Sequence, residues 1–506
     1  MSQNYQPAPS NVTLVRGLGL TAATSVNIAN MIGTGVFLKT RVMTCNVETP
    51  GMVITVWVVA GLLALAGALT YAELTTMMPR AGGEYVFMRE AYGRRWGFLF
   101  GWTQFFIART GSQAALAVGF AIFLNILTGG ALSGTYFTLR PFGFAIPFGH
   151  LQLVALATIA ITTLINCGAV SLSGKVSTVL TFVKIALVLA VGVGAFLFAT
   201  GDWGHFAQSN AGGACEGVSA AARGGMAGFG AAMLGALWAY DGWNNVAPLA
   251  GEVRDPQKNL PRAFILGMLV VGALYIFVNL AYYYVLTPTE IANVPAASSV
   301  ATQVASRFMG ATAITLIAAA LMTSSFGALH TSVLAGGRYP YAMSRDRLFF
   351  QSLARLNPKT HVPVRALAAQ GVWACVLALS GSYDALTDYA IFALWIFYGL
   401  TTASVFIFRR TMPDAERPFR TPGYPVIPII FLLVTAWLLF TTLLPDPRLA
   451  LSELRTLSHF RLPEDGFQGI NLKQFVGLGL IALGLPVYWY WSRHNLAAAA
   501  PAPESD

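Results

Sequence analysis

The chain has 506 residues, of which 56% are hydrophobic and only 10% are Asp, Glu, Lys or Arg, and its formal net charge is +10. A soluble domain usually carries about a quarter charged residues, so this chain has too few charges to cover a surface in water. The basic residues fall in short stretches between apolar runs, and none of these stretches resembles a nucleic-acid surface. Composition therefore excludes an ordinary soluble protein and indicates one that is embedded in lipid.

Twelve segments are mainly apolar over the roughly 20 residues that a membrane-spanning helix needs. They lie at 16–38, 51–76, 97–127, 149–169, 176–199, 224–250, 263–286, 308–335, 364–381, 386–408, 426–444 and 473–491. With the N-terminus inside, roughly two thirds of the 31 Lys and Arg residues fall on the inner side, in agreement with the positive-inside rule. We therefore expect a multi-pass protein of the plasma (inner) membrane with both termini in the cytoplasm.

Two of the twelve segments carry residues that interrupt a helix in mid-membrane. Gly33 and Gly35 flank Thr34 in the first segment, and Asp241 precedes Gly242 in the sixth. Each glycine costs a helix about 1 kcal/mol relative to alanine, and the aspartate brings a charge into the bilayer. Backbone that leaves the helix inside a membrane must be buried in protein or line a wet cavity. Interrupted helices at matching places in two halves indicate a transporter's binding site.

The two interrupted segments each open a set of five. Because five is odd, the second set has the opposite orientation, which predicts an all-α LeuT-type fold of twelve helices with a 5+5 inverted repeat, discontinuous helices 1 and 6, and helices 11 and 12 outside the repeat. The expected divisions are a cytoplasmic tail at 1–14, helices 1–5 at 15–200, helices 6–10 at 223–410, helices 11–12 at 426–492, and a cytoplasmic tail at 493–506. Glycines that only permit close helix packing are the alternative, and two breaks at matching positions argue against it.

The ends of broken helices suit one class of ligand. A half-helix exposes unpaired N–H groups at its N-terminus and unpaired C=O groups at its C-terminus. The N–H groups suit a carboxylate, and the C=O groups suit an ammonium. An α-amino acid carries both groups on one carbon, which makes it the expected ligand.

Several motifs in chain order resemble those of the L-type amino acid transporter family, in the amino acid–polyamine–organocation superfamily. They are Ile32–Phe37 (IGTGVF), Met78–Tyr85 (MPRAGGEY), Ala108–Ala114, Trp238–Asn245 (WAYDGWNN), Gly251–Pro261, Phe326–Ser332 and Arg417–Arg420. The resemblance implies an amino-acid transporter in which the substrate carboxylate is held by the amides of Thr34, Gly35 and Val36 and by the Thr34 hydroxyl. It also implies that the carbonyls of Met31, Trp238, Ala239 and Asp241 take the ammonium, and that Trp238 is an aromatic gate.

Two ionisable residues at membrane depth are functional candidates. Lys184 either snorkels to the interface or, as the resemblance implies, bridges helices 1, 5 and 8 where sodium-coupled relatives hold sodium. The second interpretation predicts sodium-independent transport, and it makes Lys184 the candidate for any proton coupling. Asp241 either caps the half-helix after the break or faces the substrate side chain, which predicts that substrates include cationic amino acids.

Other polar residues receive structural predictions. We expect Arg109 to bond backbone carbonyls of neighbouring helices, Glu73 and Glu252 to pair with loop arginines, and His330 to be a packing residue. Leu394 and Trp395 are expected to form an apolar wall of the binding site. Neither a metal site nor a cofactor site is predicted, because the four cysteines form no CxxC or metal-ligand spacing.

The outer loops depart from the family pattern. Heteromeric members of the resembled family use a cysteine in the loop that corresponds to 128–148, and this loop has none. We therefore predict a chain that works without a disulfide-linked heavy chain. Cys45 and Cys215 fall in expected outer loops, where they either form a disulfide or remain free thiols. No function is predicted for the outer segment 445–472.

The motif inventory leaves two other functions to weigh. An enzyme is excluded by the lack of HExxH, phosphate-binding or nucleophile–base motifs. The main alternative is a proton-coupled symporter of amino acids or polyamines. The alternative from another class is an ion channel, which would need rows of filter carbonyls or charged rings.

Overall fold

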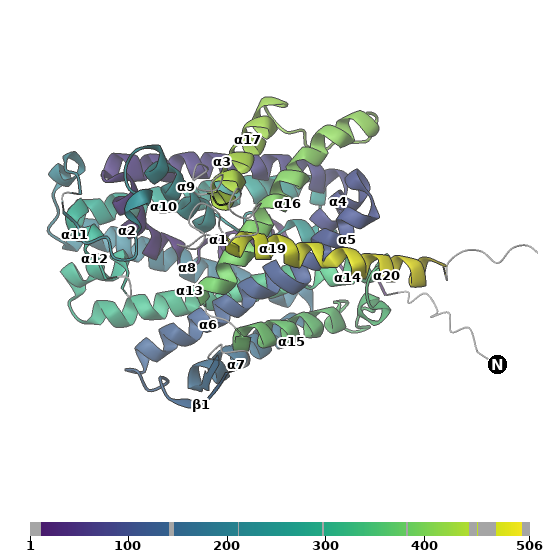
Figure 1. The fold of residues 1–506 in the computed structure, drawn as a ribbon, viewed down its shortest axis with the longest axis horizontal. Helices are drawn as coiled ribbons and strands as arrows, with labels where there is room; N and C mark the ends of the chain where they lie inside the picture. The colour runs from purple at the N-terminus through teal and green to yellow at the C-terminus, as the bar shows by residue number, and fades with distance from the viewer. Residues whose placement is uncertain are drawn as a thin grey trace, which may run out of the picture.

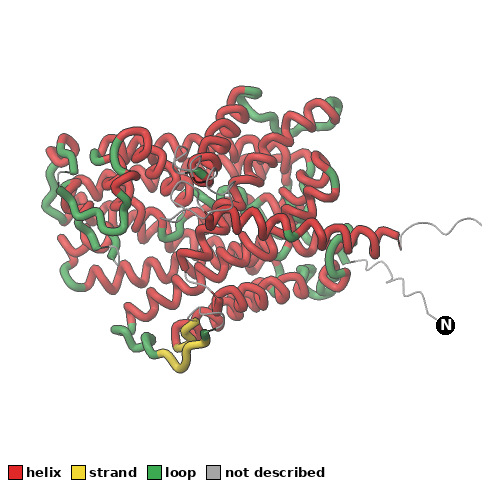
Figure 2. The backbone as a smooth tube through the Cα atoms, in the orientation of Figure 1, coloured by secondary structure: helices red, strands yellow, loops and turns green. Residues whose placement is uncertain are grey.

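The computed structural model describes residues 12–140, 146–210, 212–295, 298–380, 383–444, 453 and 472–497. In this part of the chain almost every element is a helix, and the longer helices run roughly lengthwise in an elongated bundle (Figures 1 and 2). Eight of the described helical stretches are long and apolar enough to cross a membrane, and three shorter apolar helices accompany them. The chain is therefore a polytopic helical protein, as its composition predicts.

The helices follow the predicted order. The first half contains α1 (Leu20–Met31), α2 (Gly35–Val47), α3 (Pro50–Met77), α4 (Glu84–Tyr92), α5 (Arg94–Thr103), the π-helix η1 (Gln104–Ala108), α6 (Arg109–Leu127), α7 (His150–Asn166) and α8 (Val170–Phe198). The second half contains the 3₁₀-helices η3 (Trp203–Ala207), η4 (Ala220–Ala222), η5 (Ala247–Glu252) and η6 (Gln351–Ala354), together with α9 (Gly225–Ala239), α10 (Pro256–Val285), α11 (Pro288–Ala292), α12 (Val300–Met309), α13 (Thr312–Gly336), α14 (Arg338–Arg345), α15 (Val364–Ser380), α16 (Tyr383–Thr411), α17 (Val426–Leu443), α19 (Leu472–Ala482) and α20 (Gly484–Ala497). Each predicted segment overlaps at least one of these helices, whereas the predicted outer segment 445–472 lies almost entirely outside the described residues.

The first and sixth predicted segments are interrupted, as expected. α1 ends at Met31 and α2 begins at Gly35, so residues 32–34 separate two helices. α9 ends at Ala239, and the next helix is the short η5. Figure 1 places α1 in the interior of the bundle, where it contacts α8, α10 and α13. Tyr240, Trp243 and Asn244, which follow α9, are also buried. Both interruptions therefore lie inside protein, as backbone outside a helix must at membrane depth.

A small β-hairpin between α6 and α7 departs from the all-helical prediction. Strand β1 (Thr135–Leu139) pairs antiparallel with β2 (Ile146–Gly149). The first strand is rich in β-branched and aromatic residues, which favour extended structure, and Tyr136, Phe137 and Leu139 are exposed. The strands lie in the predicted loop 128–148 except for Gly149, the first residue of the next predicted segment, so the order of the helices is unaffected.

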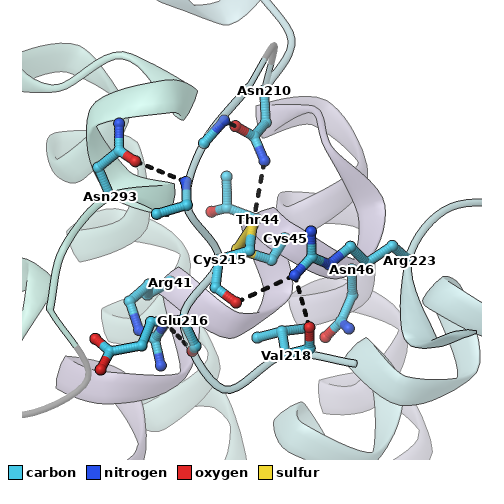
Figure 3. Close-up of a disulfide and its surroundings, with 12 residues drawn as sticks. Arg41, Thr44, Cys45, Asn46, Asn210, Cys215, Glu216, Val218, Arg223 and Asn293 are labelled. Carbon is cyan, nitrogen blue, oxygen red and sulfur yellow. Dashed lines mark hydrogen bonds between the residues drawn. A yellow bond between two sulfur atoms is a disulfide. The ribbon is translucent and has the colours of Figure 1, made fainter. Parts of the chain in front are cut away.

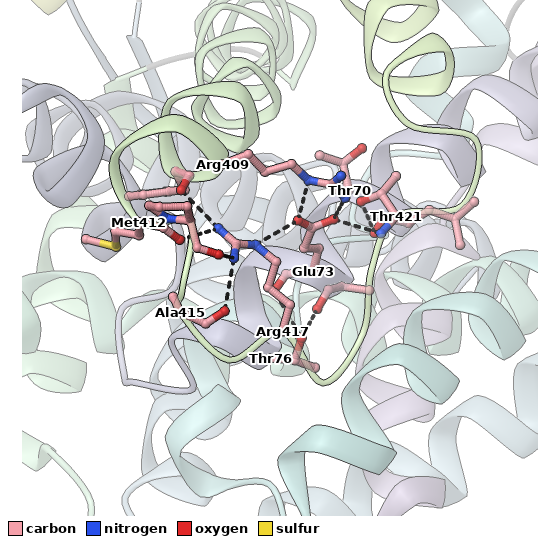
Figure 4. Close-up of polar contacts among 12 residues, drawn as sticks. Thr70, Glu73, Thr76, Arg409, Met412, Ala415, Arg417 and Thr421 are labelled. Atoms are coloured by element: carbon pink, nitrogen blue, oxygen red, sulfur yellow. Dashed lines mark hydrogen bonds and ion pairs between the residues drawn. The ribbon is translucent and has the colours of Figure 1, made fainter.

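Buried carboxylates anchor the predicted inner ends of the helices. Glu73 of α3 accepts hydrogen bonds from the Arg409 guanidinium (Nη2–Oε2 2.8 Å) and the Thr421 amide (2.7 Å), and Arg417 lies 3.6 Å away (Figure 4). Glu252 forms a two-bond pair of 2.7 and 2.8 Å with Arg338, and both side chains are 0% exposed. Both glutamates form ion pairs, as predicted, but Arg338 and Arg409 lie on α14 and α16 and not in loops as expected. Each pair joins segments that are distant in sequence.

A disulfide joins the predicted outer ends of two elements. Cys45, near the end of α2, is bonded to Cys215 in the loop between α8 and α9 (Figure 3). The same loop is tied to α2 by Arg41, whose guanidinium donates to the Glu216 carbonyl at 2.7 Å, and by Asn46, whose carbonyl accepts from the Gly224 amide at 2.7 Å. The choice that the sequence left open is thus resolved in favour of a disulfide.

The buried Arg338–Glu252 pair generates a stability prediction. Glu252→Gln leaves the Arg338 charge buried without its counter-ion, which typically costs about 3–5 kcal/mol. We expect a clearly lower unfolding temperature for the purified protein in detergent. The matched control is Arg307→Gln, which breaks an ion pair with Glu290 whose side chains are 52% and 44% exposed and typically costs about 1 kcal/mol or less. Equal shifts for the two variants would contradict the structural role assigned to Glu252.

Candidate functional site

A cavity lies where the two interruptions meet. Its lining residues are Asn30, Met31, Gly33, Thr34, Gly35, Ser112, Leu116, Trp238, Ala239 and Asp241. Six of the seven residues predicted to bind substrate therefore line one cavity, and Val36, the seventh, is buried immediately beside them. Asn30, Ser112 and Leu116 were not predicted, because their residue types carry no distinctive signal in an apolar segment.

Two glycines allow the interrupted helices to approach each other. A Cβ on Gly35 would lie 2.6 Å from the Cβ of Ala239, closer than real Cβ atoms approach. Gly242 has a φ of +98°, and a Cβ there would overlap the side chain of Asn30. A positive φ is accessible to glycine at little cost. The same glycines that break the helices therefore bring the two breaks together.

The N-terminus of α2 presents unpaired amide groups at this cavity. Thr34 is the N-cap residue, and its carbonyl accepts from the amides of Phe37 and Leu38 at 3.2 Å. Within the described residues, the amides of Gly35 and Val36 have no hydrogen-bond acceptor. They are the donors that every helix N-terminus leaves unsatisfied. Together with the helix dipole they form a site suited to a carboxylate.

Tyr275 of α10 links the carbonyl ends of both breaks. Its hydroxyl lies 2.7 Å from the Met31 carbonyl oxygen and 2.9 Å from that of Ala239. The Trp238 carbonyl accepts the amide of Asp241 at 3.1 Å. The Met31 oxygen also accepts the Gly33 amide at 2.7 Å, and the Trp238 oxygen also accepts the Tyr240 amide, so both already have two donors. The Ala239 oxygen keeps a second lone pair that can still accept. Tyr275 was not predicted, and the only signal for it was a hydroxyl in an otherwise apolar segment.

Lys184 lies at the end of α1 and not at the membrane interface. Its side chain is 1% exposed, and its ammonium donates to the carbonyls of Ala29 (2.5 Å) and Ile32 (2.9 Å). Ser324 of α13 donates to the same Ile32 oxygen at 2.7 Å, and a Cβ on Gly327 would meet the Lys184 side chain. The snorkelling alternative is therefore wrong. The ammonium sits between α1, α8 and α13, which correspond to predicted helices 1, 5 and 8.

Asp241 faces the cavity and a tyrosine of α16. Its Oδ1 accepts a hydrogen bond from the Tyr398 hydroxyl at 2.8 Å. The first helix after the break begins at Ala247 with Val246 at its N-cap, so Asp241 does not cap it. The capping alternative is therefore wrong, and a carboxylate oxygen is left beside the cavity.

A polar network continues from this carboxylate. The Tyr398 hydroxyl also contacts Asn244 at 3.4 Å, and the Asn244 amide donates to Glu84 at 2.5 Å. Glu84 of α4 also accepts from the Tyr339 hydroxyl at 3.1 Å. Burial raises the pKa of the Glu84 carboxyl, despite these donors and the nearby Arg109 charge. The network joins the second break to α4, α14 and α16.

Contacts in the described part of the chain contradict two further predictions. Arg109 donates to the side-chain oxygen of Asn245 at 2.7 Å, so the expected bond to backbone carbonyls is wrong. Trp395 stacks on Phe431 of α17, and neither it nor Leu394 lines the cavity, so the predicted apolar wall is also wrong.

His330 is a packing residue, as predicted. It is buried, and its ring nitrogens contact the Asn166 side chain and the Ser173 carbonyl, each at 3.1 Å. Among the described residues no group of His, Cys, Asp and Glu is placed to hold a metal ion.

Comparison with known proteins decides the family. The model of the family described as amino acid permease matches residues 18–457. The chain belongs to the amino acid permease family. Two relatives confirm its predicted resemblance to the L-type amino acid transporters. The mouse b(0,+)-type amino acid transporter 1 is 30% identical over 436 residues, which is 86% of this chain and 84% of the relative. The rabbit large neutral amino acids transporter small subunit 2 is 28% identical over 498 residues, which is 97% of this chain and 84% of the relative.

A bacterial relative covers a similar part of the permease. It is the serine/threonine exchanger SteT of Bacillus subtilis (strain 168), 31% identical over 436 residues, which is 86% of this chain and 92% of the relative. Family membership and the apolar helices together make the chain a multi-pass membrane transporter of amino acids and not an enzyme.

The contact between the two breaks generates a prediction for the site. Gly35→Ala places a methyl group 2.6 Å from the Cβ of Ala239, so α2 and α9 must separate and the cavity changes shape. Overpacking of this kind costs about 1–3 kcal/mol, and we expect amino-acid uptake to fall about tenfold or more. Gly51→Ala on α3, where a Cβ meets nothing within 4 Å, is the control. Normal uptake by both variants would contradict the proposed tight contact.

Proposed function

We propose that this permease is a secondary transporter that exchanges amino acids across the plasma (inner) membrane by alternating access, without sodium. The observation that carries the proposal is one cavity lined by Gly35, whose amide is unpaired like that of the adjacent Val36, and by the residues at the carbonyl ends of both helix breaks. These groups match the carboxylate and the ammonium that every α-amino acid carries on one carbon. Exchange is favoured because one of the relatives is a serine/threonine exchanger.

The proposed fold is a twelve-helix LeuT-type bundle with both termini in the cytoplasm. Support comes from the eight long apolar helices, the three shorter ones and the two breaks, which open equivalent sets of five predicted segments. In this arrangement 15–200 and 223–410 are the inverted repeats and 426–492 holds helices 11 and 12. The tails 1–14 and 493–506 then lie in the cytoplasm, in line with the distribution of Lys and Arg.

Each part of the cavity has a proposed role. The amides of Thr34, Gly35 and Val36, with the Thr34 hydroxyl, bind the substrate carboxylate. The carbonyls of Met31, Trp238, Ala239 and Asp241 bind the ammonium, and the Trp238 ring closes the cavity. Tyr275, which contacts two of these carbonyls, fixes their spacing.

Lys184 is proposed to replace a coupling ion. Backbone carbonyls of an unwound helix are the groups that hold sodium in transporters with broken helices. Here the ammonium of Lys184 already donates to two such oxygens. A fixed positive charge at this point repels a second cation, so the transport cycle should not need sodium.

Counterflow in proteoliposomes tests the proposal. Liposomes that contain the purified chain alone are loaded with unlabelled amino acids, and uptake of a radiolabelled panel is measured in sodium and in choline buffer. An exchanger takes up label only when internal amino acid is present, and to the same extent in both buffers. Uptake driven by a pH gradient into empty liposomes would indicate the proton-coupled amino-acid or polyamine symporter instead. Loss of uptake in choline would contradict the role of Lys184, and single-channel currents would indicate a channel.

Counterflow in proteoliposomes also tests the prediction that the chain needs no heavy chain. The outer loop 128–148 contains no cysteine for a disulfide to a companion protein. We propose that the chain transports alone, so full activity is expected without any added partner. Uptake that appears only when a membrane extract is added would contradict this part of the proposal.

We propose that the Asp241 carboxylate contacts the substrate side chain and that cationic amino acids are therefore among the substrates. Asp241→Asn removes the charge and keeps the shape. A hydrogen bond to a charged group contributes about 1.5–3 kcal/mol, so we expect uptake of labelled lysine or arginine to fall on the order of tenfold relative to uptake of a neutral amino acid. Tyr398→Phe removes the hydroxyl that donates to Asp241 but keeps the charge, and it should retain the preference. Equal losses for cationic and neutral substrates would contradict the assignment.

A further inference from the structure

Lys39 lies over the ring that is proposed to gate the cavity. It is on α2, about one helical turn beyond Gly35 in the direction of the disulfide end. Its ammonium nitrogen is 4.8 Å from the centre of the Trp238 ring. The edge of the same ring is 3.4 Å from the point where a Cβ on Gly35 would lie. The indole therefore lies against α2, with the N-terminal residue of that helix at the ring edge and the Lys39 ammonium over the ring.

The surroundings make room for this contact. A Cβ on Gly235, one turn before Trp238 on α9, would lie 3.8 Å from Cδ of Lys39. The aliphatic part of the lysine thus runs along a face of α9 that has no side chain. The geometry is that of a cation–π contact, in which a positive charge within about 6 Å of the ring centre is attracted to the indole face.

The contact is not needed to hold α2 and α9 together. The Cys45–Cys215 disulfide, the Arg41–Glu216 hydrogen bond and the Asn46–Gly224 hydrogen bond join α2 to the loop that leads into α9. Removal of the Lys39 charge leaves all of these ties in place. The packing of the two helices is therefore still supported when that charge is removed.

We propose that Lys39 is a positioning residue that holds the Trp238 ring in its closed position over the cavity, and so sets how tightly substrate is retained from the outer side. The inference rests on the proposed function, in which Trp238 is the gate and α2 leads outward. Opening toward the outside requires the ring to leave the ammonium, whereas opening toward the inside does not disturb the contact. Lys39 therefore acts on one side of the transport cycle.

The test compares the KM for substrate offered at the outer face with the KM for substrate offered at the inner face. Counterflow is measured in vesicles of known orientation, so that KM for the same labelled amino acid is obtained from each side. Lys39→Met keeps the unbranched stem and removes the charge. We expect its outer KM to rise about two- to fivefold, the size typical of a partly exposed cation–π contact, with the inner KM unchanged. Lys39→Arg keeps a cation for the ring and should restore the outer KM.

Controls make the outcomes decisive. Lys175→Met removes an equal charge from an exposed position at the start of α8 and should alter neither KM. Lys39→Gln serves in place of Lys39→Met if the methionine variant is not recovered as a monodisperse protein. An unchanged outer KM, equal changes on both faces, or an arginine variant as impaired as the methionine variant would overturn the proposal. Absence of amino-acid uptake by the unaltered protein would instead contradict the proposed function.

Discussion

A helix that stops inside a membrane leaves N–H and C=O groups for which lipid offers no hydrogen-bond partner. The rest of the site is arranged around this constraint. At the end of α1, Lys184 and Ser324 donate to the Ile32 carbonyl, and Tyr275 joins the carbonyls of Met31 and Ala239. The amides that open α2 remain unpaired within the described residues. The protein satisfies most of the carbonyls itself and leaves the anion-binding end available to a ligand.

Buried ion pairs and a disulfide hold the helix ends on both sides of the two breaks. Toward the predicted inner face, buried carboxylates pair with Arg338 and Arg409 and fix the ends of α3, η5, α14 and α16. Toward the outer face, the disulfide and the loop bonds fix the end of α2. Such strongly paired ends resist local unfolding.

The sequence was sufficient for the helices, the two breaks and most of the cavity. Its apolar runs are long, and a Gly-Thr-Gly or Asp-Gly sequence in mid-membrane has a clear physical meaning. Contacts between distant segments were harder to predict. Tyr275 and Tyr398 look like ordinary aromatic residues, and only the fold brings them to Met31 and Asp241. Arg109 donates to the side-chain amide oxygen of Asn245 and not to the backbone carbonyls that were expected, because the turn after the second break places Asn245 beside it.

The central claim is that the two helix breaks form the amino-acid site. The most direct test is an experimental structure of the reconstituted protein with a bound amino acid. The account predicts the carboxylate within about 2.7–3.2 Å of the amides of Gly35 and Val36, with the ammonium at the carbonyls of Trp238 and Ala239 and the indole of Trp238 covering both. An amino acid bound away from these breaks, with the α2 amides occupied by another group, would contradict it.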